Sequence, residues 1–145
     1  MDRFRTIKGG MLIAFVIGMI DALVIWTIAN LFDVTILLPE SPGSETLTEL
    51  TIPPVLFIIG LSSVLAGILL WVLQRFVPDR ALIIFQIVAV IALALSLVLP
   101  FTLDQPIEGQ LALLTMHLLV GSAIIATFTW VAMKPRLRPQ DPVEN

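Results

Sequence analysis

Residues 10–32, GMLIAFVIGMIDALVIWTIANLF, decide the fold that we predict for this chain. As a helix, this run is long enough to cross a hydrocarbon core of ~30 Å at about 1.5 Å per residue. It carries Asp21, which has apolar residues on both sides for nearly a full helical span. A carboxylate at mid-bilayer depth is costly and needs a partner, a proton or a polar cavity. The run therefore predicts a transmembrane helix organised around Asp21.

Three further apolar runs of similar length follow, at residues 54–76, 81–100 and 110–133. Hydrophobic residues make up 58% of the chain and charged residues 13%, which is typical of membrane proteins rather than of soluble domains. We predict an all-α integral membrane protein: one four-transmembrane-helix bundle over residues 1–134, then a disordered tail at 135–145. The chain has no cysteine, so disulfides, thiolate metal sites and cysteine nucleophiles are excluded.

The basic residues before the first run also fit a secretory signal peptide, which is the alternative to a transmembrane helix there. The run is longer than a signal-peptide core, however, and it leads into Asn30, Leu31 and Phe32 rather than a small-residue cleavage site. We therefore interpret it as a transmembrane helix.

Charge placement predicts the orientation of the bundle. Every Lys and Arg lies before the first run, between the second and third, or after the fourth: Arg3, Arg5, Lys8, Arg75, Arg80, Lys134, Arg136 and Arg138. The two opposite loops carry only acids: Asp33, Glu40, Glu45, Glu49, Asp104 and Glu108. By the positive-inside rule, both termini of this plasma-membrane protein are predicted to be cytoplasmic.

The long loop between the first two helices, residues 33–53, predicts a small extracytoplasmic β-hairpin. Residues 34–38 and 46–52 mix apolar residues with threonines, and turn-forming residues separate them at 39–44. Such a hairpin needs packing beneath it to be stable, so we expect it to lie over the outer end of the bundle.

Helical spacing predicts three polar residues inside the bundle. On the first helix, Asp21 shares a face with Gly10, Ala14, Gly18, Ile25 and Ile28. Counted from the outer helix ends, Ser63 lies at about the same depth as Asp21, and His117 only ~6 Å above it. On the fourth helix, His117 shares a face with Gln110, Leu114, Gly121, Ile124 and Phe128. Asp21, Ser63 and His117 are thus a candidate buried polar cluster.

Small residues predict where helices approach each other closely. Gly18, Gly60, Gly67 and Gly121 form the candidate helix-packing seam, and Gly60, Ser63 and Gly67 lie on one stripe of the second helix. This stripe fits packing inside the bundle, and it also fits a contact with a second copy. If it faces Asp21, a tightly closed bundle with a structural clasp is favoured. If it faces outward, a partner is indicated.

The pairing of Asp21 with His117 leaves two interpretations open. It is a structural clasp that orients two helices, or it is a proton or small-ligand site of the kind that ionisable membrane residues often form. One His and one Asp without Cys is a poor ligand set for zinc or copper, and one His cannot supply bis-histidine haem ligation. A triad of Ser62 or Ser63 with His117 and Asp21 is a remote alternative. We predict no catalytic residues, no metal, no cofactor and no binding of nucleic acid.

Two resemblances accompany these patterns. The segment from Arg80 to Trp130, with Leu114-Thr115-Met116-His117-Leu118 opening the last helix, resembles an uncharacterised bacterial family of four-span membrane proteins of unknown function with a Met-His pair in the last helix. Asp21 in the first helix resembles the membrane-embedded glutamate of small multidrug-resistance exporters, which binds substrate and proton in turn. The long loop and one-sided positive charge depart from that exporter pattern and argue against antiparallel dual-topology dimers.

These observations predict a membrane protein that is not an enzyme, with one of two functions. It is an accessory or structural subunit that contacts the lipid bilayer and another membrane protein or a second copy. Alternatively, it binds a proton or small ligand through Asp21 and His117, as a transporter or sensor does. A cavity beside Asp21 would favour the second function.

Overall fold

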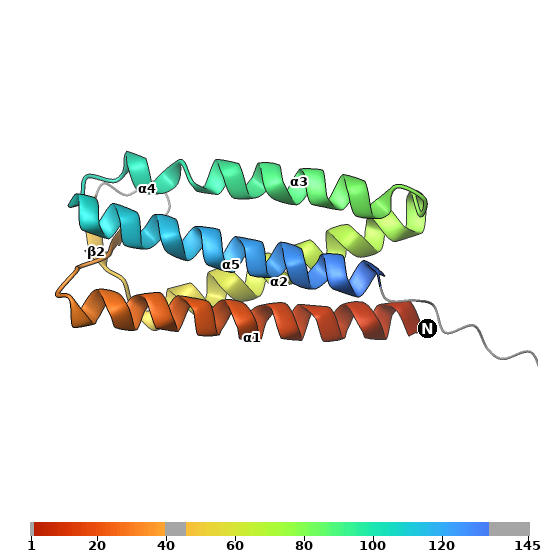
Figure 1. The fold of residues 1–145 in the computed structure, drawn as a ribbon, viewed down its shortest axis with the longest axis horizontal. Helices are drawn as coiled ribbons and strands as arrows, with labels where there is room; N and C mark the ends of the chain where they lie inside the picture. Colours follow the sequence, from red (N-terminus) through yellow and green to blue (C-terminus); the bar gives the residue numbers. More distant parts are fainter. Residues whose placement is uncertain (1, 40–45, 134–145) are drawn as a thin grey trace, which may run out of the picture.

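Four long antiparallel helices lie side by side in the computed structural model, which describes residues 2–39 and 46–133 (Figure 1). They are α1 (Asp2–Leu31), α2 (Ile52–Phe76), α3 (Ala81–Ser96) and α5 (Ile107–Met133), and a short helix α4 (Leu99–Thr102) follows α3. Four segments are long and apolar enough to span a membrane, at Ile7–Leu31, Ile52–Phe76, Ala81–Thr102 and Ile107–Met133. The predicted four-helix architecture is confirmed, and the predicted tail at 135–145 lies outside the described residues.

The helices form a ring in which each packs against its two neighbours, and α2 also contacts α5 across the ring. The most extensive contacts join α1 to α5, followed by those of α1 with α2, while α3 packs between α2 and α5. The start of α1 and the end of α5 lie at the same end of the bundle (Figure 1). We call the other end, which carries the strands and α4, the hairpin end.

Helix α1 begins at Asp2, eight residues before the predicted start of its apolar run. Ile7 explains the extension, because it is 1% exposed and packs in a cluster with Leu70, Phe85 and Phe128. The rings of Phe85 and Phe128 meet edge to face at 5.9 Å. The basic segment is therefore a continuation of the helix and not a separate interfacial piece.

The last turn of α1 closes in a Schellman motif. Asp33 takes a left-handed conformation with φ of 56°. The N–H of Val34 donates to the carbonyl of Ala29 at 2.8 Å, and the N–H of Asp33 donates to the carbonyl of Asn30 at 3.3 Å. Aspartate tolerates this conformation better than most residues other than glycine. The motif ends the helix and directs the chain back over the bundle.

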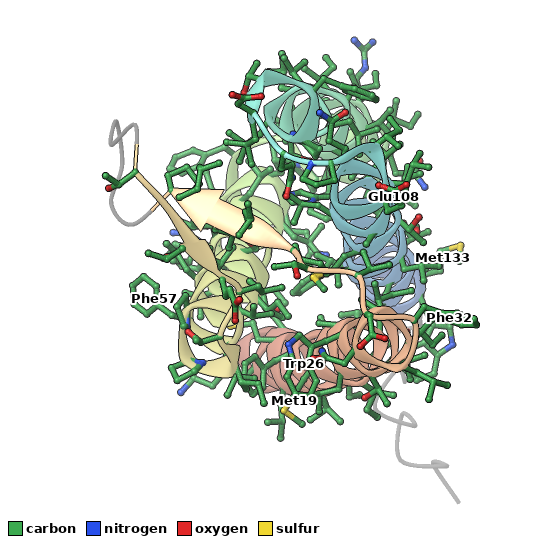
Figure 2. All side chains as sticks on the ribbon, turned by 90° about the vertical axis from the view of Figure 1, so that its left-hand side faces the viewer. Met19, Trp26, Phe32, Phe57, Glu108 and Met133 are labelled. Atoms are coloured by element: carbon green, nitrogen blue, oxygen red, sulfur yellow. The ribbon has the colours of Figure 1, made fainter. Side chains whose placement is uncertain are left out.

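The predicted hairpin is confirmed in its strands, β1 (Leu37–Pro39) and β2 (Leu47–Glu49), while the turn at 40–45 lies outside the described residues. The strands pair antiparallel with Leu38 opposite Thr48. Ile36 and Leu50 flank the pair, are buried, and belong to an apolar cluster with Ala22, Ala29, Ile59, Leu103, Leu113 and Met116. Viewed along the bundle axis, the hairpin extends over α2 (Figure 2). This packing supplies the support that an isolated hairpin lacks.

The third span is broken near its hairpin end, which the sequence analysis did not predict. We expected one helix over 81–100, but α3 ends at Ser96 and Pro100 lies in the first turn of α4. Proline at position 100 has no N–H to donate to the carbonyl of Ser96, and its ring crowds that carbonyl. The helix therefore stops four residues before the proline and restarts around it.

Candidate functional site

The buried face of α1 departs from the predicted one at its centre. Gly10, Ala14 and Gly18 are buried as expected, but the face then continues through Ala22 and Ala29. At ~100° per residue, Ala22 stays in line with Gly18, whereas Asp21 turns to the edge. Asp21 is half-buried and Ile28 is 46% exposed, so the predicted continuation through Ile28 is wrong.

The buried face of α5 is displaced by one residue from the predicted face in its first half. Gly109, Leu113 and Met116 are buried, whereas Gln110, Leu114 and His117 are only half-buried. Gly109 explains this rotation, because a methyl group there would lie 2.8 Å from the carbonyl oxygen of Thr35 under the hairpin. In the second half, Ile124 and Phe128 are buried as predicted.

Close contacts between α1 and α5 place Asp21 and His117 at the same level along the bundle axis. A methyl group on Gly10 would lie 3.4 Å from Phe128, and one on Gly18 would lie 3.3 Å from Val120. In an antiparallel pair, each step of three residues along α1 corresponds to three residues back along α5. Continuing this register from Gly18 and Val120 brings Asp21 level with His117.

The contacts between α1 and α2 place Ser63 elsewhere. Gly67 faces Met11, Gly60 faces Phe15, and Gly18 faces Ile59, so Ser63 is level with Ala14. Ser63 therefore lies ~10 Å from the level of Asp21, and the predicted equal depth is wrong. The depth counted from the helix ends was wrong because the two helices do not end at the same level. At the hairpin end, α1 continues about two turns beyond the level at which α2 begins, and the hairpin occupies the space above the start of α2.

Neither Ser63 nor His117 makes a hydrogen bond with Asp21. The imidazole of His117 donates its Nδ1–H to the carbonyl of Leu113 at 2.8 Å. The hydroxyl of Ser63, a residue 1% exposed, has no hydrogen-bond partner. Across residues 2–39 and 46–133, no hydrogen bond or ion pair involves the Asp21 carboxylate.

All four glycines of the candidate seam face side chains of another helix. A methyl group on Gly67 would overlap Met11, and one on Gly121 would lie 2.5 Å from Leu93 of α3. On Gly18 it would lie 3.0 Å from Ile59, and on Gly60 it would lie 3.5 Å from Phe15. The stripe of α2 that carries Gly60, Ser63 and Gly67 thus faces α1, at the level of Met11 and Phe15 rather than of Asp21. It faces inward, so this stripe does not indicate a contact with a partner.

Three glutamines make polar contacts that the sequence analysis did not assign. Gln105 is buried, and its Oε1 accepts the N–H of Leu37 at 2.9 Å, which ties the hairpin to the loop before α5. Gln110 donates to the carbonyls of Leu103 and Gln105 at 3.2 and 3.3 Å. Gln86 of α3 donates to Thr129 of α5 at 3.3 Å. Amide side chains flanking an apolar run are the sequence signal for such contacts.

A pocket of about 280 Å³ lies at the hairpin end, away from the predicted cluster. Its lining combines the end of α1 with the strands: Trp26, Asn30, Asp33, Val34, Thr35, Ile36, Glu49 and Leu50. A much smaller apolar pocket beside it, between α1 and α2, shares Trp26 and Leu50. Trp26 lies on α1 below the hairpin (Figure 2). Neither pocket is lined by Asp21, Ser63 or His117.

Comparison with protein families matches residues 2–133 to the model of a family of unknown function, DUF6069. The match spans nearly the whole chain and confirms the predicted resemblance to a family without known activity. No curated protein and no solved structure matches. The resemblance to small multidrug-resistance exporters therefore stays a prediction.

Proposed function

Because the chain belongs to the DUF6069 family, whose function is unknown, we propose its role from its geometry: it is an accessory membrane subunit that packs laterally against another membrane protein. Its four long apolar helices lie within the bilayer, and the bundle acts as a preformed unit rather than as a channel or an enzyme. The lipid bilayer and one protein partner are its contacts.

The close packing of the helices around the bundle axis carries this proposal. Gly18, Gly67 and Gly121 bring neighbouring helices so close that a single methyl group would lie 3.0 Å or less from a side chain. The apolar side chains of Ile59, Phe85, Leu113 and Phe128 fill the space between the helices. A bundle packed in this way supports binding on its outer surface better than passage of a solute along its axis.

The membrane orientation is part of the proposal. We infer that the hairpin end is extracytoplasmic and both termini are cytoplasmic in the plasma membrane, because all eight Lys and Arg residues fall on the other side. The absence of cysteine allows a direct test. A single cysteine at Asp79 should react with an impermeant thiol reagent only after the cells are opened, and one at Asp104 should react in intact cells. The opposite labelling pattern would reverse the orientation.

The accessory role is tested by the size of the protein in its native membrane. The tagged chain is released into polymer-bounded lipid discs, and the protein mass in each disc is measured. We expect one assembly of defined stoichiometry that contains a second, different membrane protein. A single species with the mass of one chain would contradict the accessory role.

A proton or small-ligand site at Asp21 and His117 is the second candidate function. The register of α1 and α5 favours it, since both residues lie at one level and the Leu113 contact of His117 uses only Nδ1. Such pairs serve as proton relays in membrane proteins. The test is proton flux into liposomes under an imposed pH gradient. Flux that is lost in both Asp21→Asn and His117→Gln would replace the accessory role with transport, and no flux above empty liposomes is expected.

A further inference from the structure

The Asp21 carboxylate is placed where a partner from outside the chain can reach it. On α1, the residues four before, three after and seven after Asp21 share its side of the helix. These are Ile17, Val24 and Ile28, which are 38%, 50% and 46% exposed. Gly18 and Ala22, on the other side of Asp21, are buried. The carboxylate thus stands at the border between the packed interior and the lateral surface.

Asp21 also lies near the middle of its span. The apolar segment Ile7–Leu31 has its midpoint at Met19, two residues or ~3 Å from Asp21. In the membrane setting proposed above, this is the depth at which an isolated carboxylate is least tolerated. Ionised acids at this depth are found paired with another polar or charged group.

No residue in the described part of the chain supplies a cation to Asp21. The nearest Lys or Arg along α1 is Lys8, more than three helical turns or ~20 Å away. Arg3 and Arg5 precede Lys8 in the sequence, Arg75 lies in the last turn of α2, Arg80 lies in the α2–α3 connection, and the other three follow Met133 in the sequence. His117 is level with Asp21, but its Nδ1–H is bonded to the Leu113 carbonyl, and it forms no ion pair with the acid.

We propose that the α1 surface formed by Ile17, Asp21, Val24 and Ile28 binds a transmembrane helix of another protein that carries a Lys or Arg near its midpoint. The apolar side chains pack against that helix, and the carboxylate pairs with its cation. Pairing removes two uncompensated charges from the hydrocarbon core at once, which makes the contact specific for a helix with a basic residue at this depth.

A second copy of this chain does not fit the surface. The only Lys and Arg residues within the four apolar spans, Lys8 and Arg75, lie one residue from a span end and far from the level of Asp21. A symmetric contact through this face would therefore bring two Asp21 carboxylates together with no cation at their depth. Like charges at close range destabilise such a contact. The complementary charge must therefore come from a different protein.

The test uses model transmembrane peptides in lipid vesicles. The full chain carries a donor dye on a cysteine introduced at Asp79, an exposed position outside the spans. The acceptor-labelled peptides are leucine–alanine helices with a central lysine, with leucine at that site, or with the lysine moved next to the lipid headgroups. Energy transfer measures binding as a function of peptide per lipid.

We expect the central-lysine peptide to bind at least tenfold more tightly than the leucine peptide and the displaced-lysine peptide. Asp21→Leu should reduce the preference for the central-lysine peptide to less than twofold. Asp21→Asn should also weaken the preference for that peptide. The control Asp104→Asn removes an exposed carboxylate outside the spans and should leave the preference unchanged. Helical content and melting temperature of each variant show that it is folded, and Asp21→Asn serves if Asp21→Leu does not fold.

Equal binding of the central-lysine and leucine peptides overturns the proposal, as does a preference that survives Asp21→Leu. Energy transfer between donor- and acceptor-labelled copies that needs Asp21 and no peptide would assign the surface to self-association instead. The inference rests on the accessory role, but the two fail differently. If the protein forms a native assembly but shows no preference for the lysine peptide, the accessory role stands and the proposed contact through Asp21 fails. If the protein prefers the lysine peptide but is a single chain in its native membrane, the accessory role fails and the binding surface at Asp21 stands.

Discussion

Helix α1 after its basic first turns and helix α3 are both strongly apolar, yet they are held in the bundle in different ways. α1 presents Gly10, Ala14, Gly18, Ala22 and Ala29 as a continuous buried face to α5 and α2. In α3, only Ala81 and Phe85 are buried, both in its first two turns. The rest of α3 offers exposed side chains such as Ile87, Val90 and Leu95.

The difference follows from residue size. Small residues on α1 let the backbones approach, so the contact is spread over many positions of the helix. On α3, large side chains keep the neighbours at a distance, and a few anchors make the contact: Phe85 against Phe128, Leu93 against Gly121, and Gln86 bonded to Thr129. We infer that the small-residue face of α1 is insensitive to loss of any single side chain and sensitive to added volume. In contrast, α3 is sensitive to loss of its few anchoring side chains.

The largest expected effect is on the anchor of α3. Phe85→Ala removes a fully buried ring and its edge-to-face contact with Phe128 at 5.9 Å. Aromatic deletions in cores typically cost ~3–5 kcal/mol, and we expect about 3 kcal/mol here. Thermal or denaturant unfolding in detergent measures it. The control is Phe101→Ala on the neighbouring helix α4, where the ring is exposed and the cost should be below about 0.5 kcal/mol. Equal losses of unfolding free energy in Phe85→Ala and Phe101→Ala would contradict the assignment of Phe85 as the anchor of α3.

The second effect tests added volume on the α1 side. Gly67→Leu places a side chain where Met11 of α1 already lies, and overpacking of this kind costs about 1–3 kcal/mol. Gly9 is the matched control, because no other atom lies within 4 Å of a methyl group placed there. Gly9→Leu should be neutral or stabilising by up to ~1 kcal/mol through helix propensity. If the unfolding free energies of the two variants are alike, α1 is not tightly packed against α2.

Much of this architecture could be predicted from the sequence. The apolar runs and the two threonine-containing segments of the loop carry strong local patterns, and all appear in the structure, with boundaries that move by up to eight residues. The break between α3 and α4 was missed although its cause, Pro100, is local. Its effect falls four residues earlier, on the carbonyl of Ser96, and the proline was interpreted only as the end of the span.

The candidate site was harder to predict because it depends on the relative height and rotation of helices. The depth of Ser63 was counted from helix ends, but contacts such as Met11 with Gly67 and Gly18 with Ile59 set the true register. The faces of α1 and α5 were traced through Asp21 and His117 because both residues share a helical face with small residues such as Gly18 and Gly121. Packing selected Ala22 and Met116 instead, one position along each helix. A stripe of small residues was therefore too coarse a signal to place a single polar side chain.

The smallest expected effect concerns the polar anchor of α3. Gln86→Leu removes the hydrogen bond from Nε2 to the hydroxyl of Thr129, 3.3 Å away, and keeps a side chain of similar length. Hydrogen bonds between membrane helices average ~0.6 kcal/mol, so the cost should be close to that value. Thr129→Val should cost the same, and the double variant should cost less than the two singles together, because both remove one bond. Strict additivity in this cycle would mean that the bond contributes nothing. α3 would then depend on Phe85 and Leu93 alone, and its contrast with α1 would be sharper still.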